Sequence, residues 1–132
     1  MSEANPDRGE HELPLGRRTY LLRPSFAAIT AIERKTERAL PELIRMGNSG
    51  TMPLAIAGIV AAELVKAGAG DDDLTRRVSA AKMGEMIFER GIAPAVARLT
   101  LCLLDAATGG RDAQGEAKAV ATQTDEDDAT AE

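Results

Sequence analysis

The chain contains 132 residues, enough for one domain, and 44% of them are apolar while only 2% are aromatic. The core must therefore be aliphatic, and the abundance of Ala favours helices because Ala loses no rotamer entropy on folding. The net charge of −5 belongs to residues 111–132, which hold seven acids and two bases. The other 110 residues hold 14 acids and 14 bases and are neutral. Because phosphate contacts need clustered Lys and Arg, a neutral body without a basic face argues against nucleic-acid binding.

The first part of the chain predicts a β-hairpin after a polar, flexible leader at residues 1–8. Apolar and polar residues alternate over residues 11–15, and an extended pattern resumes over 19–22 after a glycine-containing turn at 16–18. Pro14 cannot donate a ladder hydrogen bond, so the first strand is an edge strand or Pro14 faces outward. A lone hairpin is marginal in water, so this one must pack on helices or pair with another chain.

Two helices are expected next. Ser25 is suited to cap the first, whose apolar residues recur at helical spacing until Pro41 ends or kinks it near Ala39. A loop is expected at residues 47–51. The second helix begins near Thr51 and carries only two charged residues, so it is either central in the domain or partly turned toward a partner.

The remaining elements follow a break at residues 67–70. The acids Asp71–Asp73 suit a helix N-terminus better than a metal site, because three adjacent carboxylates project in different directions. Residues 74–91 predict one or two short helices, whose Met residues form core or an adaptable binding surface. A strongly apolar helix is expected over 92–107, with Pro94 in its first turn.

These patterns predict an α+β, mainly α, fold. A single domain over residues 9–108 would consist of the N-terminal β-hairpin followed by about four helices. From residue 109 the apolar periodicity stops, and residues 109–132 are expected to form a disordered acidic tail.

The sequence offers little that could carry catalysis or bind a cofactor or a metal. The single histidine, His11, lies in the expected first strand, and the single cysteine, Cys102, lies in an apolar run where a buried, inert thiol is expected. There is no GxxxxGK phosphate loop and no CxxC pair. The N-terminus has no apolar signal core, and no apolar run approaches the ~20 residues that cross a bilayer. We therefore expect a soluble, cytoplasmic, non-enzymatic binding protein.

The layout resembles a family of gene-transfer-agent and prophage tail proteins grouped with phage tail-assembly chaperones. Residues 5–44 are similar to the family's opening: a polar leader, an Arg-Gly-Glu strand (here residues 8–10), a Gly-Arg turn, a second strand and a helix. Residues 56–70 and 91–107 resemble its two remaining apolar helices. The chain departs from the pattern in its acidic tail and in Pro14.

The resemblance implies a role in tail morphogenesis in the bacterial host cell. Such proteins bind the long helical tape-measure protein, and possibly the tail tube protein, while tube subunits polymerise. An exposed apolar helix face would serve this binding. The expected interaction residues are Leu54, Ile56 and Ile59, with Leu99 and Leu103 as weaker candidates.

Several alternatives stay open at this stage. The chain could be a minor structural component of the tail or tube, and so part of the particle, or a small regulatory adaptor. It could also form a homo-oligomer. The sequence does not separate these possibilities from the chaperone function.

Overall fold

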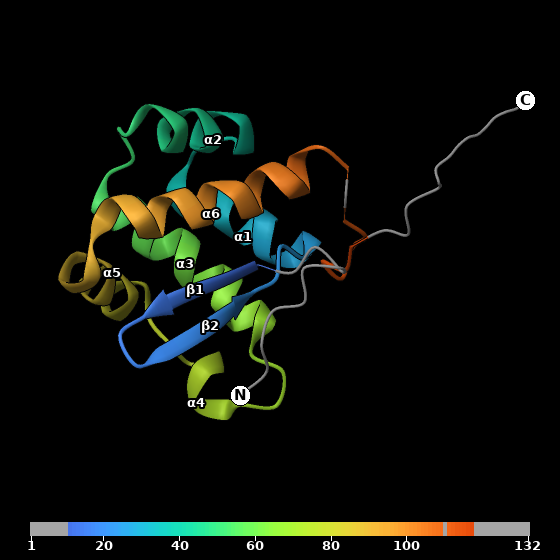
Figure 1. The fold of residues 1–132 in the computed structure, drawn as a ribbon. Coiled ribbons are helices and arrows are strands. Elements are labelled where there is room, and N and C mark those ends of the chain that lie inside the picture. The colour runs from blue at the N-terminus through green and yellow to red at the C-terminus, as the bar shows by residue number, and fades with distance from the viewer. Residues whose placement is uncertain (1–10, 110, 118–132) are drawn as a thin grey trace, which may run out of the picture.

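The computed structural model describes residues 11–109 and 111–117, and within them a hairpin precedes six helices (Figure 1). The two strands are β1 (His11–Leu15) and β2 (Arg18–Leu22). The helices are α1 (Phe26–Thr36), α2 (Leu40–Ser49), α3 (Leu54–Gly68), α4 (Asp73–Arg76), α5 (Ala80–Arg90) and α6 (Ile92–Ala107). The predicted mainly helical fold with an N-terminal hairpin is confirmed. The predicted leader at residues 1–8 lies outside the described residues.

The hairpin packs on helices through one of its faces. β1 and β2 are antiparallel, with Leu13 opposite Tyr20, and Gly16 begins the turn with a φ of +67°, a conformation that glycine adopts without strain. The inward side chains Leu13, Leu15, Tyr20 and Leu22 are buried against α3 and α6, whereas Pro14 is exposed. The expectation that Pro14 faces outward is therefore confirmed.

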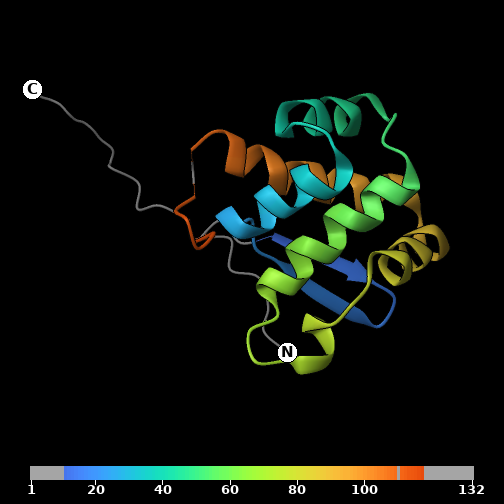
Figure 2. The ribbon, with the colours of Figure 1, turned by 180° about the vertical axis from the view of Figure 1, so that it is seen from behind.

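Helix α3 is the central element of the domain. It contacts α1, β2, α4, α5 and α6, and its buried residues occupy most of its circumference. Seen from behind, α1 and α3 lie side by side, with the hairpin beyond them (Figure 2). The second predicted helix, expected to be either central or partly turned toward a partner, corresponds to α3 and is central over most of its circumference.

The region around Pro41 forms two helices where one broken helix was expected. α1 ends at Thr36, because Glu37 takes a left-handed conformation with a φ of +56°, and Pro41 lies in the first turn of α2. The loop predicted at residues 47–51 is wrong for its first three residues, since α2 continues to Ser49 and ends at Gly50. The glycine that suggested the loop, Gly47, instead lets α2 pack closely against Thr100 of α6.

The helix starts follow the chemistry expected of caps. The Ser25 hydroxyl accepts a hydrogen bond from the amide of Ala28, and the Ser79 hydroxyl accepts one from Lys82. Asp72 caps α4 by accepting from the Thr75 amide, which confirms that the acidic triplet marks a helix start. Hydrogen bonds from the hydroxyl and amide of Thr75, and then the Arg18 guanidinium, hold the pKa of Asp72 below its usual value.

The domain does not end at residue 108 as expected. Residues 111–117 fold back as a short segment, here called the clasp, which lies against the junction of β2 and α1. The Phe26 amide donates to the Ala113 carbonyl at 2.8 Å, and Arg23 pairs with Glu116 at 2.5 Å. The predicted disordered tail is therefore wrong for 111–117, while 118–132 lie outside the described residues.

Candidate interaction groove

An apolar groove runs along the surface between α3 and α5. Its lining is almost entirely hydrophobic or small, and only one lining residue is charged. The residues are Leu54, Ala55 and Ile59 from α3, and Ala80, Ala81, Gly84, Glu85 and Phe88 from α5. Phe88 stands at one end and is 66% exposed, a large apolar surface without a partner in the described part of the chain.

The groove exists because α3 and α5 cross at close range. Gly58 lies against the backbone of α5: a Cβ added there would be 2.5 Å from the Ala80 carbonyl oxygen. Gly84 lies on the other helix of this crossing, and a Cβ added to it would meet nothing closer than 3.8 Å. Small residues on both helices thus bring the two backbones together and leave a shallow apolar floor, which suits the ridge of another helix.

The five predicted interaction residues fall in three different places. Leu54 and Ile59 line the groove, each partly exposed. Ile56 is also partly exposed but packs against the core outside the groove lining. Leu99 and Leu103 are 0% exposed in the core, so the prediction that α6 presents them to a partner is wrong.

The half of the groove that α5 provides was not predicted from the sequence. The sequence predicted a Met stripe here, and Met83 is indeed buried, whereas Ala81 and Phe88 are exposed beside the groove and the buried Gly84 lines its floor. Their spacing of three and four residues places them on one side of a helix, and this signal could have revealed the face. The exposed large apolar residues of α6 are Ile92, Leu101 and Leu104, not the buried Leu99.

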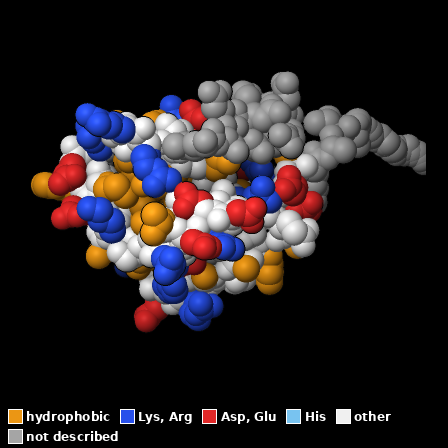
Figure 3. Space-filling view, turned by 90° about the horizontal axis from the view of Figure 1, so that it is seen from below, with side chains coloured by type: hydrophobic (Ala, Val, Ile, Leu, Met, Phe, Trp, Pro, Cys, Tyr) orange, Lys and Arg blue, Asp and Glu red, His pale blue; other side chains and the backbone are white. Residues whose placement is uncertain are grey.

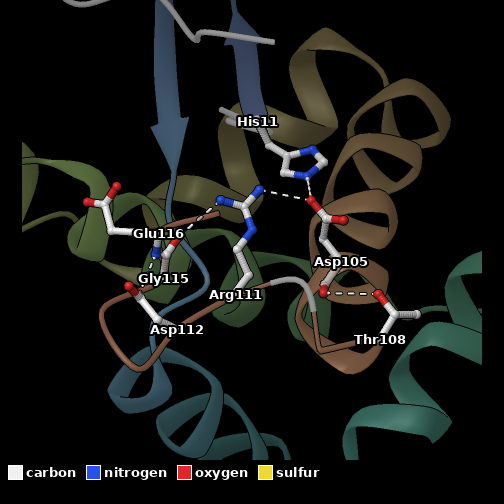
Figure 4. Close-up of polar contacts among 7 residues, drawn as sticks. All are labelled: His11, Asp105, Thr108, Arg111, Asp112, Gly115 and Glu116. Carbon is white, nitrogen blue, oxygen red and sulfur yellow. Dashed lines mark hydrogen bonds and ion pairs between the residues drawn. The ribbon is translucent and has the colours of Figure 1, made fainter. Parts of the chain in front are cut away.

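The most connected polar cluster joins β1, α6 and the clasp (Figure 4). The same carboxylate oxygen of Asp105 lies 2.8 Å from Nε2 of His11 and 2.9 Å from a guanidinium nitrogen of Arg111. Arg111 also donates to the Gly115 carbonyl at 3.0 Å, and its side chain is only 4% exposed. These contacts hold three chain segments together.

Cys102 is buried in the core, as the sequence predicted. Burial raises the pKa of its thiol to about 12, because the apolar surroundings disfavour the thiolate. The thiol therefore stays protonated near neutral pH, and a protonated, inaccessible sulfur is a poor nucleophile.

In the described part of the chain, no three His, Cys, Asp or Glu side chains gather closely enough to hold a metal ion. None of the helices within residues 11–109 is long and apolar enough to cross a membrane. The face seen from below in Figure 3 mixes hydrophobic side chains with positive and negative ones, so neither sign of charge dominates it.

No protein-family model matches this chain, and no curated protein or solved structure is significantly similar to it. The groove and the polar cluster are therefore interpreted from their own chemistry.

Proposed function

We propose that the chain is a tail-assembly chaperone of a gene transfer agent or prophage, which binds the tape-measure protein during tail morphogenesis. The observation that carries the proposal is the apolar α3–α5 groove with the exposed Phe88 at its end. A tape-measure protein is a long helix that exposes apolar stripes until the tube closes around it. A groove of this kind shields such a stripe by taking up residues spaced three and four apart.

The chemistry of the groove suits reversible binding. Half of its eight lining residues are Ala or Gly, so many of its contacts with a helix are modest in area and easily exchanged. Phe88 is the one large aromatic anchor, and aromatic anchors contribute much of the energy at interfaces. A chaperone has to release its client when tube subunits arrive, and one anchor over a small-residue floor allows that.

Co-expression with the tape-measure protein tests this proposal. We expect the wild-type chain to raise the soluble fraction of the tape-measure protein and to co-purify with it. Phe88→Glu places a charge in the apolar groove and should reduce co-purification by about tenfold or more. Leu101→Glu is the matched control, because Leu101 is 57% exposed on α6, outside the groove, and this variant should co-purify like the wild type.

Two results would contradict the proposal. Failure of the wild-type chain to solubilise or co-purify with the tape-measure protein would rule out the chaperone function. Equal loss from both variants would exclude the groove as the binding surface. Recovery of the chain as a stoichiometric part of purified particles would favour the alternative, a minor structural component of the tail or tube.

A further inference from the structure

A small cleft with two arginines in its lining lies at the end of the domain that contains the hairpin turn. Arg90 and Arg98 line this cleft together with the edge of β1 and Gly91 at the start of α6. The Arg90 guanidinium lies against Gly16, where an added Cβ would be 2.8 Å from it, and Arg17 is the next residue in the turn. The cleft lined by Arg90 and Arg98, together with the adjacent turn residue Arg17, is called the arginine cleft below.

These three arginines differ from most basic residues of the domain. In the described part of the chain, eight Lys or Arg side chains pair with a carboxylate within 4.0 Å: Arg18, Arg23, Lys35, Arg38, Lys66, Arg76, Lys82 and Arg111. The arginine cleft contributes none of these pairs, and within the described residues its side-chain hydrogen bond runs from Arg98 to the Glu12 carbonyl at 3.4 Å. The cleft therefore keeps its positive charges available for carboxylates from elsewhere.

The start of α6 adds to the positive potential at this cleft. No side chain caps this helix, and no acidic residue lies in its first turn. The amide dipoles of a helix place partial positive charge at its N-terminus, and an acid would normally offset it. The first turn of α6 therefore supplies no carboxylate to the arginine cleft.

The chain's own acidic run has the right charge and enough reach. Residues 118–132 hold five acids and one base, a net charge of −4, and four of the acids are consecutive at Asp125–Asp128. Ala117 lies beside Leu22, at the end of the hairpin opposite the turn. A five-residue strand spans roughly 13–17 Å, and the eight residues 118–125 can extend to at most about 26–29 Å. Figure 1 shows the clasp and the turn at opposite ends of the hairpin.

We propose that the acidic run Asp125–Asp128 docks on the arginine cleft of the same chain. Single exposed ion pairs are weak, but a short tether keeps the local concentration of the run in the millimolar range, so that several pairs form together. The docked run contacts Arg90, the last residue of α5, and an acidic partner segment would have to displace it from there. Because the pairs are exposed, salt should loosen the contact. The inference does not depend on the chaperone function.

A spin label beside the acidic run tests this contact in the full-length chain. Thr124→Cys provides the attachment site, and the buried Cys102 stays unlabelled. We expect the label to cause loss of amide NMR peak intensity at Gly16, Arg17, Gly91 and Ile92. The triple substitution Arg17→Gln, Arg90→Gln, Arg98→Gln should abolish that loss, and 0.5 M salt should weaken it (about 4 Å screening length).

The control removes two arginines that are exposed and unpaired elsewhere in the described domain. Arg34→Gln with Arg45→Gln should leave the intensity loss at the cleft unchanged, because these residues lie on α1 and α2. Absence of the loss in the wild-type chain would overturn the proposal, as would persistence of the loss in the triple variant. Loss that appears only when labelled and isotope-enriched chains are mixed would show docking between copies and would also overturn it.

Discussion

Two glycines on facing helices illustrate how single residues set the α3–α5 contact. Gly58 has no room for a methyl group, because a Cβ there would overlap the carbonyl oxygen of Ala80, which is backbone and cannot rotate away. Gly84 has ordinary contact distances around it, and it lies in the groove floor. The same chemical change should therefore affect stability differently at the two positions.

We predict that Gly58→Ala lowers the free energy of unfolding by about 1–3 kcal/mol, because α5 must shift to admit the methyl group. Gly84→Ala should be neutral or should stabilise the chain by up to about 1 kcal/mol, since Ala is the better helix former and the site admits it. Urea unfolding followed by circular dichroism measures both. Equal destabilisation by the two variants would show that the crossing is not as close as the geometry indicates.

At the scale of elements, the clasp converts part of an apparently featureless tail into a component of the domain. Arg111 is buried almost completely and bonds Asp105 of α6, while Glu116 pairs with Arg23 after β2. Gly115 is needed in this segment because a side chain there would collide with the backbone of Pro24 and Ser25. The first and last parts of the described chain are thus held together.

We predict that truncation after residue 117 leaves stability nearly unchanged, within about 0.5 kcal/mol, because the clasp contacts of residues 111–117 are kept. Truncation after residue 109 should destabilise the chain by about 2–4 kcal/mol, since Asp105 then loses its buried arginine partner. Thermal unfolding of the two truncated chains measures the difference. Identical melting temperatures would mean that the clasp does not contribute to the stability of the fold.

Elements with a local signal were predictable from the sequence, and elements decided by distant contacts were not. The hairpin and α6 were predicted closely because alternation, turn glycine and Pro94 act within a few residues. The clasp has no apolar periodicity, and its order comes from Asp105 and Arg23, which the sequence does not place nearby. For the same reason only half of the groove lining was predicted: Leu54 and Ile59 lie in the groove, but apolarity alone could not tell them from the buried Leu99.

At the scale of the whole molecule, Glu63 links stability to pH. Its side chain on α3 is 11% exposed and accepts from Lys35 of α1 at 2.6 Å and from Lys66 at 3.2 Å. Burial alone would raise the pKa of Glu63, but the two ammonium groups overcome that effect and hold its pKa below the usual value. Folding therefore favours the ionised form, and the carboxylate joins the helix after the hairpin to the centre of the core.

A carboxyl group whose pKa is lower in the folded state stabilises the fold above its unfolded pKa, near 4.5 for Glu63, and this stabilisation is lost as the pH falls through the lower folded value. We predict that Glu63→Gln costs about 1.5–3 kcal/mol at pH 7, where two charge-assisted bonds are lost. The cost should shrink as the pH drops below 4.5, because the wild-type carboxyl is then protonated too. Urea titrations between pH 7 and pH 3 measure this convergence.

Glu85→Gln is the control, since the Lys82–Glu85 pair is exposed and should contribute little at any pH. A Glu63→Gln cost that stays constant over this range would show that the link between α1 and α3 does not depend on the charge of Glu63.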